Sequence, residues 1–319
     1  MVATYFYTYV TVQIAIVEPV LRQAVRSNLY HLGCREISFT NDLSVLRERL
    51  DSAPCDLLML QADIGSPRTA PAMVNAIRHG ELASNPFLPV VAVTHNPTAE
   101  QVKALVDAGV DDILPYPWSE SYVDARLENL IHNRKPFVVT SDYIGPDRRQ
   151  KSRDEANAAM VKPFTVPNPL KAKALDRLSN ATLEDQIRAM AQRVSIDKIL
   201  RLAELCIRLA GEITALGAAG QQSSSVARNG LARLSDASRA LIRRAGDSSY
   251  ARACTNINTL HRTAQVMLQA IDSGVEPELQ LLERLALQAV HDFGVNPNLF
   301  HAPLTQDVIK KRISATKGA

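Results

Sequence analysis

The chain has few aromatic residues and few cysteines. Phenylalanine, tyrosine and tryptophan together make up 5% of its 319 residues, and Trp118 is the single tryptophan. Hydrophobic residues still make up 46%, so we expect aliphatic cores. The cysteines are scattered, and none has the spacing of a metal ligand pair: Cys34, Cys55, Cys206 and Cys254. They predict reduced thiols in a cytoplasmic protein, not a disulfide framework.

Long apolar runs and an excess of one charge are also missing. No run approaches the ~20 apolar residues of a membrane-spanning helix. Residues 1–10 are apolar but have no preceding Lys or Arg and no small-residue cleavage pattern, which favours a lead-in to a strand over a signal peptide. The formal charge of +3 argues against a dedicated nucleic-acid binder. We find no glycine-rich phosphate loop, Ser-His-Asp constellation or catalytic carboxylate pair, and expect no enzyme, cofactor or metal.

Residues 1–133 alternate short apolar runs with segments of helical spacing. The expected strands are Thr11–Val17, Glu36–Thr40, a run ending at Leu60, Pro89–Thr94 and Asp112–Leu114. Gly33 and Gly109 are placed to end helices, and Thr98 and Ser119 to begin them. Strands alternating with helices predict a parallel sheet covered on both faces. The expected fold is a flavodoxin-like, doubly wound α/β sheet.

Five segments of this domain follow one another in a characteristic order: Ile14–Arg22, Cys55–Gln61, Val90–Thr94, Ala108–Asp112 and Pro115–Trp118. In this order and at this spacing they resemble the receiver domain of bacterial two-component response regulators. The resemblance implies a site at the carboxyl ends of the strands. In the family, an acidic pair and an Asp hold Mg²⁺, and that Asp accepts a phosphoryl group. A Thr or Ser and a Lys before a proline, which can be cis, then contact that group.

This chain departs from the family pattern at most of those positions. The acidic pair is reduced to Glu18, and the acceptor position is Gln61. Thr94 is present, although a Thr at a strand end is also a common strand former. Tyr116 replaces the Lys before Pro117. An amide cannot act as the nucleophile, and one Glu with an amide is a poor Mg²⁺ site, so we expect a degenerate receiver.

Two further features leave alternatives open. Asp63 stands two residues past Gln61 and could substitute for the missing acceptor, although we expect it in the loop. Tyr116 and Trp118 could form a partner-binding face, since aromatic residues are enriched at interfaces. The same two residues could equally pack against the edge of the sheet.

Residues 134–185 are expected to be an extended, proline-rich and basic linker. The segment Gly145–Arg149 resembles a tail found after some bacterial receiver-like domains, and Arg148 belongs to it. Arg149 and Arg153 have the spacing of the arginines in cyclic-dinucleotide-binding PilZ domains, but no β-barrel pattern follows them. These arginines could capture an anion or dock on an acidic partner surface.

Residues 186–319 are expected to form an all-α helical bundle. Helices are predicted from Asp197 to Leu216, from Ala227 to Ala245, from Cys254 to Ile271, from Pro277 to Phe293 and from Leu304 to Ile313. Their apolar residues recur at alternating steps of three and four. Small residues at many of these positions indicate close helix packing, and we expect a homodimer through this domain.

The sequence therefore predicts a non-enzymatic signalling or scaffold protein that acts through contacts with other proteins. One alternative is an effector that binds a cyclic dinucleotide or another anion through Arg149 and Arg153. A second alternative is a helical phosphatase-like modulator of a partner receiver. The bundle shows no recognisable carboxylate and amide pair on one helix turn, which such a phosphatase would use.

Overall fold

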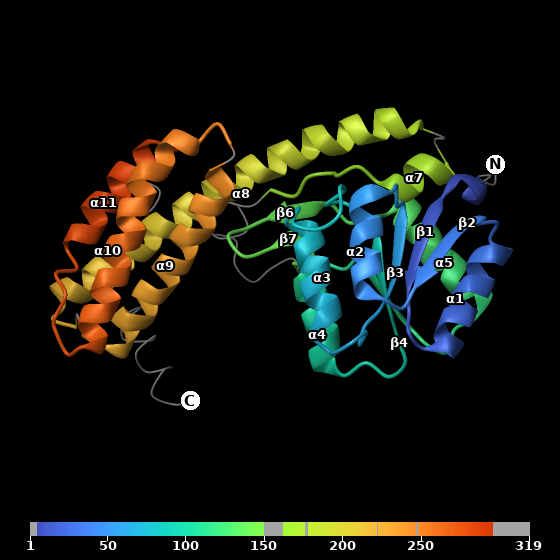
Figure 1. Ribbon diagram of the computed structural model, residues 1–319, viewed down its shortest axis with the longest axis horizontal. Helices are drawn as coiled ribbons and strands as arrows, with labels where there is room; N and C mark the ends of the chain where they lie inside the picture. Colours follow the sequence, from blue (N-terminus) through green and yellow to red (C-terminus); the bar gives the residue numbers. More distant parts are fainter. Residues whose placement is uncertain (1–4, 150–161, 176–177, 222, 247, 296–319) are drawn as a thin grey trace. The chain divides into compact units, whose positions relative to one another are not determined.

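The computed structural model describes residues 5–149, 162–175, 178–221, 223–246 and 248–295. The chain divides into two compact units, Met1–Val194 and Ser195–Ala319. The first unit is built on a parallel sheet, and the second is helical (Figure 1). Within the described residues, none of the helices combines the length and the apolar character needed to cross a membrane.

The sheet of the first unit has five parallel strands in the order β2-β1-β3-β4-β5. The strands are β1 (Thr11–Ala15), β2 (Glu36–Thr40), β3 (Leu57–Gln61), β4 (Val90–Thr94) and β5 (Asp112–Pro115). All residues of β3 and β4 are buried, because helices cover both faces of the sheet. This order is the flavodoxin-like order that the sequence predicted.

Helices cover both faces of the sheet (Figure 1). The cores place α1 (Pro19–His31) and α5 (Glu120–His132) on one face, and α2 (Leu43–Ser52), α3 (Thr69–Arg78) and α4 (Ala99–Ala108) on the other. The predicted caps are confirmed: the Thr98 side chain accepts a hydrogen bond from the Gln101 N–H, and Ser119 accepts one from Tyr122. Gly109 ends α4 at a φ of +95°, where a glycine is favoured.

The structure differs from the extended linker expected for residues 134–185. A hairpin of β6 (Phe137–Val139) and β7 (Ile144–Pro146) follows α5, and Phe137 bridges to Phe164. The short helix α7 (Pro169–Ala174) places Leu170 in the core beneath α1 and α5. Apolar side chains explain this packing, since Phe137 and Leu170 are 0% exposed. Pro169 is the first residue of α7, a position where proline is favoured.

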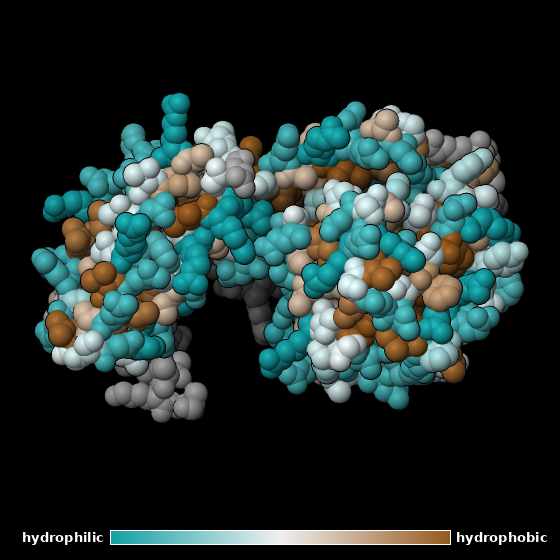
Figure 2. Space-filling model, viewed as in Figure 1, coloured by the Kyte–Doolittle hydropathy of each residue, from teal (hydrophilic) through white to brown (hydrophobic). Residues whose placement is uncertain are grey.

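The second unit is built from α8 (Asn180–Ala218), α9 (Ser225–Ala245), α10 (Cys254–Asp272) and α11 (Leu281–His291). Its core is aliphatic and alanine-rich, as predicted. On the face shown in Figure 2, hydrophilic and hydrophobic residues are interspersed. The helix predicted for residues 304–313 lies outside the described residues.

The first bundle helix begins earlier than predicted. It was expected to start at Asp197, but α8 starts at Asn180, where the Ser179 hydroxyl accepts a hydrogen bond from the Thr182 N–H. Leu183 and Ile187 in its first turns pack in a core of the first unit. The unit boundary therefore lies at residue 194 and not at 186, within a continuous helix.

A carboxylate is buried where β1 and β3 begin. Oδ2 of Asp56 accepts a hydrogen bond from the Thr11 N–H at 2.9 Å, and the residue is 3% exposed. Burial raises the pKa of Asp56 to about 6, although the Thr11 N–H and Lys173 oppose that rise. An unfolded Asp has a pKa of about 3.9, so ionisation of Asp56 destabilises the folded unit.

We expect Asp56→Asn to raise the free energy of unfolding on the order of 2 kcal/mol at about pH 8, with little effect at about pH 4. In the wild type, the loss of stability caused by ionised Asp56 is absent below the unfolded-state pKa. It grows as the pH rises and is complete above the folded-state pKa. Urea unfolding followed by Trp118 fluorescence measures it. Asp142→Asn, at an exposed site, is the control. An equal gain in the free energy of unfolding at both pH values would show that the ionisation of Asp56 is not the cause.

Candidate functional site

Polar and aromatic side chains gather where the parallel strands of the first unit end. Glu18 follows β1, Gln61 ends β3, His95 follows β4 and Tyr116 follows β5. Because the strands are parallel, their carboxyl ends meet at one edge of the sheet. This carboxyl edge is the candidate site, as the sequence predicted for Glu18, Gln61 and Tyr116.

The amide of Gln61 joins the loops that follow β1 and β3. Its Oε1 accepts hydrogen bonds from the backbone N–H groups of Val17 (2.8 Å) and Glu18 (3.1 Å). Its Nε2 donates to Oδ1 of Asp63 at 2.9 Å. Gln61 is only 8% exposed, and each end of its amide has a partner. A carboxylate at this position could accept the two N–H groups but could not donate to Asp63.

A second group of contacts begins at Glu18. Its Oε1 lies 2.6 Å from Nε2 of His95. The His95 ring meets Tyr116 edge to face with centroids 5.0 Å apart, and Tyr116 meets Trp118 in the same way at 5.0 Å. These contacts form a ladder of three rings, which we call the aromatic ladder: His95, Tyr116 and Trp118. His95 was not among the predicted site residues, although it directly follows the predicted fourth strand.

The predicted residues Pro117 and Thr94 lie next to Tyr116, at the ends of β5 and β4. The Tyr116–Pro117 peptide bond is cis, as the receiver resemblance implied. The Tyr116 N–H donates to the carbonyl of Thr94 at 2.7 Å. Thr94 is 6% exposed and is the last residue of β4. Its position therefore agrees with the strand-forming role that the sequence left open.

The residues at the carboxyl edge do not fit the Mg²⁺ site that the receiver resemblance implies. The Glu18 carboxylate is paired with His95, and an oxygen of Asp63 is bound by Gln61. Oε1 of Gln61 already has two N–H donors. Among the described residues, no three His, Cys, Asp or Glu side chains come together as metal ligands. Mg²⁺ prefers several oxygen ligands with carboxylate charge, which this arrangement does not offer.

The predicted basic residues lie apart from the aromatic ladder. Nη2 of Arg148 donates to the carbonyls of Val110 (2.7 Å) and Asp111 (2.8 Å), which precede β5. Tyr116 follows β5, so about 13 Å of strand separates the two positions. Arg149 is paired with Asp147 at 2.9 Å, and Arg153 lies outside the described residues. The structure therefore does not unite Arg148, Tyr116 and Trp118 in one surface.

A buried charge cluster at the opposite edge was not found from the sequence. Oδ2 of Asp111 accepts from Nη2 of Arg78 (2.8 Å) and Oδ1 accepts from Nε of Arg134 (2.7 Å). Both guanidinium groups lie over the Phe137 ring, at 5.2 and 5.1 Å from its centroid. We call these four residues the Asp111 cluster. Because Arg134 and Phe137 follow α5 and Asp111 precedes β5, these contacts hold the segment after α5 against the sheet.

The charges of the Asp111 cluster depend on one another. Burial would raise the pKa of Asp111, but Arg134 and Arg78 outweigh it, so the pKa is lowered. Burial lowers the pKa of Arg78 to about 10, which leaves it charged at neutral pH. Three of its other four N–H groups donate to the carbonyls of Gly109, Pro86 and Leu88.

Comparison with known proteins gives matches only to solved structures. Neither a protein-family model nor a curated protein matches the chain. An orphan response regulator of H. pylori is 22% identical, covering 37% of this chain and 93% of that one, with a TM-score of 0.32. A putative pilus assembly-related protein from Burkholderia pseudomallei is 19% identical, covering 39% and 91%, with a TM-score of 0.33. A CheY-like response regulator protein from Mesorhizobium loti is 18% identical, covering 37% and 96%, with a TM-score of 0.31.

The likenesses concern the N-terminal part of the chain. The strand order β2-β1-β3-β4-β5 and the helices on both faces give residues 11–132 a flavodoxin-like fold. The chemistry at the carboxyl edge follows from the residues of this chain.

Proposed function

We propose that this chain is a non-enzymatic signalling protein whose receiver-like unit acts through protein contacts and does not accept a phosphoryl group. The observation that carries the proposal is the amide of Gln61 at the end of β3, bonded to two backbone N–H groups and to Asp63. A carboxamide does not act as the nucleophile that forms an acyl phosphate. Tyr116 stands where a lysine would neutralise phosphoryl oxygens.

The aromatic ladder is the surface that we propose for partner contact. Its rings are partly exposed and held by one another, and the Glu18 pair fixes His95 at the other end. Aromatic residues held in one conformation lose little entropy when a partner covers them. The proposed partner is another protein of a signalling or structural assembly, and the bundle is proposed to form a homodimer.

Treatment with acetyl phosphate and Mg²⁺ is expected to leave the intact mass of the full chain unchanged. An ordinary receiver domain treated in parallel shows that the donor is active. Asp63 is the carboxylate nearest in sequence to the missing acceptor, and it is already bound by Gln61. Acid-labile phosphoryl incorporation that disappears in Asp63→Asn would overturn the proposal.

A further inference from the structure

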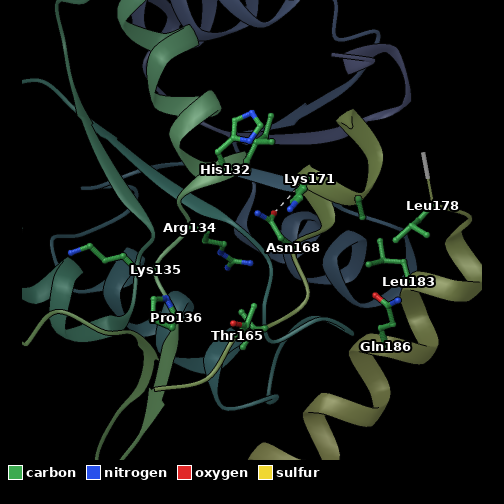
Figure 3. A pocket seen from close by; sticks show the side chains of 13 residues that line it. His132, Arg134, Lys135, Pro136, Thr165, Asn168, Lys171, Leu178, Leu183 and Gln186 are labelled. Carbon is green, nitrogen blue, oxygen red and sulfur yellow. Dashed lines mark hydrogen bonds between the residues drawn. The ribbon is translucent and has the colours of Figure 1, made fainter. Parts of the chain in front are cut away.

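A cavity of about 250 Å³ lies within the first unit, between the end of α5, the segment before α7 and the first turns of α8 (Figure 3). None of its 13 lining residues is acidic, and four are basic: His132, Arg134, Lys135 and Lys171. Its volume equals the share of about eight water molecules in the liquid, which is enough for a small organic molecule.

Arg134 brings unused hydrogen-bond donors to this cavity. Its side chain is only 5% exposed. Three of its five N–H groups have partners: Nε and Nη2 donate to Asp111, and Nη1 donates to the Pro167 carbonyl at 3.2 Å. Among the described residues, the other two N–H groups, one on each Nη, have no partner. Figure 3 shows the guanidinium between Asn168 and Thr165. Buried charged donors without acceptors are unfavourable, so an acceptor in the cavity would stabilise them.

The charge around the cavity is positive. Arg78 and Arg134 share the single carboxylate of Asp111, which leaves one positive charge in excess. The Lys171 ammonium has no ion pair among the described residues. Lys135 extends away from the other side chains in Figure 3 and interacts with Asp147. Arg134 and Lys171 are therefore the two groups best placed to hold a negative charge.

Apolar residues also line the cavity. Among them, Leu178 and Leu183 lie on the side away from Arg134 in Figure 3, next to Gln186. Leu183 and Gln186 belong to the first turns of α8 (Figure 3). A ligand that fills the cavity would need an apolar part to contact Leu178 and Leu183 and an oxyanion for Arg134 and Lys171.

We propose that this cavity binds a small organic anion. Its carboxylate or phosphate group accepts hydrogen bonds from Arg134 and Lys171, and its apolar part packs against Leu183. Binding stabilises the first turns of α8, the helix that continues into the second unit. The site is separate from the carboxyl edge, so it does not depend on the function proposed above.

The proposal is tested by titrating the full chain with phenyl phosphate and with benzoate, followed by calorimetry. Inorganic phosphate tests the anion alone, and phenol tests the apolar part alone. We expect one-to-one binding of at least one aromatic anion, tighter than phosphate or phenol. The tighter of the two anions identifies a phosphate or a carboxylate ligand. Lys171→Gln should weaken binding by about tenfold, the loss of one charged hydrogen bond.

Two variants separate binding from folding. Lys162→Gln removes an exposed lysine of the same segment outside the cavity lining and should leave binding unchanged. Thr165→Phe fills the cavity from an exposed position and should abolish binding while the unfolding curve is kept. Absence of binding by either anion, or equal binding by wild type and Lys171→Gln, would overturn the proposal and leave a water-filled cavity.

Discussion

Replacing Asp111 with asparagine is expected to lower the free energy of unfolding of the first unit by about 3–5 kcal/mol. The Arg78 side chain is 0% exposed and that of Arg134 is 5% exposed. Asparagine could accept hydrogen bonds but would leave two buried cations without a counter-charge. Because Trp118 is the single tryptophan and lies in the first unit, its fluorescence during urea unfolding reports on that unit.

A matched substitution on the surface separates burial from charge. Asp107 is paired with Lys103 one helical turn away, and both side chains are largely exposed. Asp107→Asn should change the free energy of unfolding by at most about 0.5 kcal/mol. Similar losses for Asp107→Asn and Asp111→Asn would contradict the role given to the Asp111 cluster.

The same carboxylate predicts a pH dependence. The pKa of Asp111 is lowered in the folded unit, because the two arginines outweigh the effect of burial. Its contribution to stability is therefore complete above the unfolded-state pKa of about 3.9 and is lost as the pH falls through the folded-state pKa. The difference between wild type and Asp111→Asn should shrink in strong acid.

Phe137→Ala is the second substitution with a large expected effect, a loss of about 3–5 kcal/mol. Phe137 is 0% exposed, meets Phe87 edge to face at 6.0 Å and lies beneath both guanidinium groups of the Asp111 cluster. The alanine would leave a cavity and would remove both cation–π contacts. Unfolding followed by Trp118 fluorescence again provides the measurement.

This substitution tests whether the segment after α5 belongs to the first unit. Phe39→Ala is the control, because Phe39 is 53% exposed and, in the part of the chain that the structure describes, one guanidinium, that of Arg22, lies over its ring. We expect the control to cost no more than about 1 kcal/mol. If Phe137→Ala lowers the free energy of unfolding as little as Phe39→Ala does, the segment after α5 would be a linker and not part of the first unit. Because Phe137 and Asp111 share the two arginines, their double variant should not be additive.

The fold of the first unit could largely be predicted from sequence, because its strands carry an unambiguous pattern. Buried parallel strands such as Leu57–Gln61 and Val90–Thr94 are continuous apolar runs, and cap residues such as Thr98 and Ser119 mark where helices begin. The region after α5 was harder, because prolines and basic residues are typical of linkers. The buried Phe137 and Leu170 decided its structure.

The candidate site could be predicted in part. Position at a strand end placed Glu18, Gln61 and Tyr116 at the carboxyl edge. The contacts of Glu18 and Tyr116 with His95 depend on loop geometry that no local pattern specifies. Arginines are mostly exposed, so nothing in the sequence marked Arg78 as buried. Arg78 and Asp111 are also 33 positions apart, and only the folded chain brings them together.

Hydrogen exchange at the Val17 and Glu18 amides shows whether the carboxyl edge is closed to a phosphoryl group, because Gln61 accepts hydrogen bonds from both N–H groups. We expect Gln61→Ala to speed exchange at both amides, and Mg²⁺ with beryllofluoride, a phosphoryl mimic, to leave wild-type exchange unchanged. Slower exchange at these amides when Mg²⁺ and beryllofluoride are added to the wild type would contradict this expectation, because the carboxyl edge would then bind a phosphoryl group.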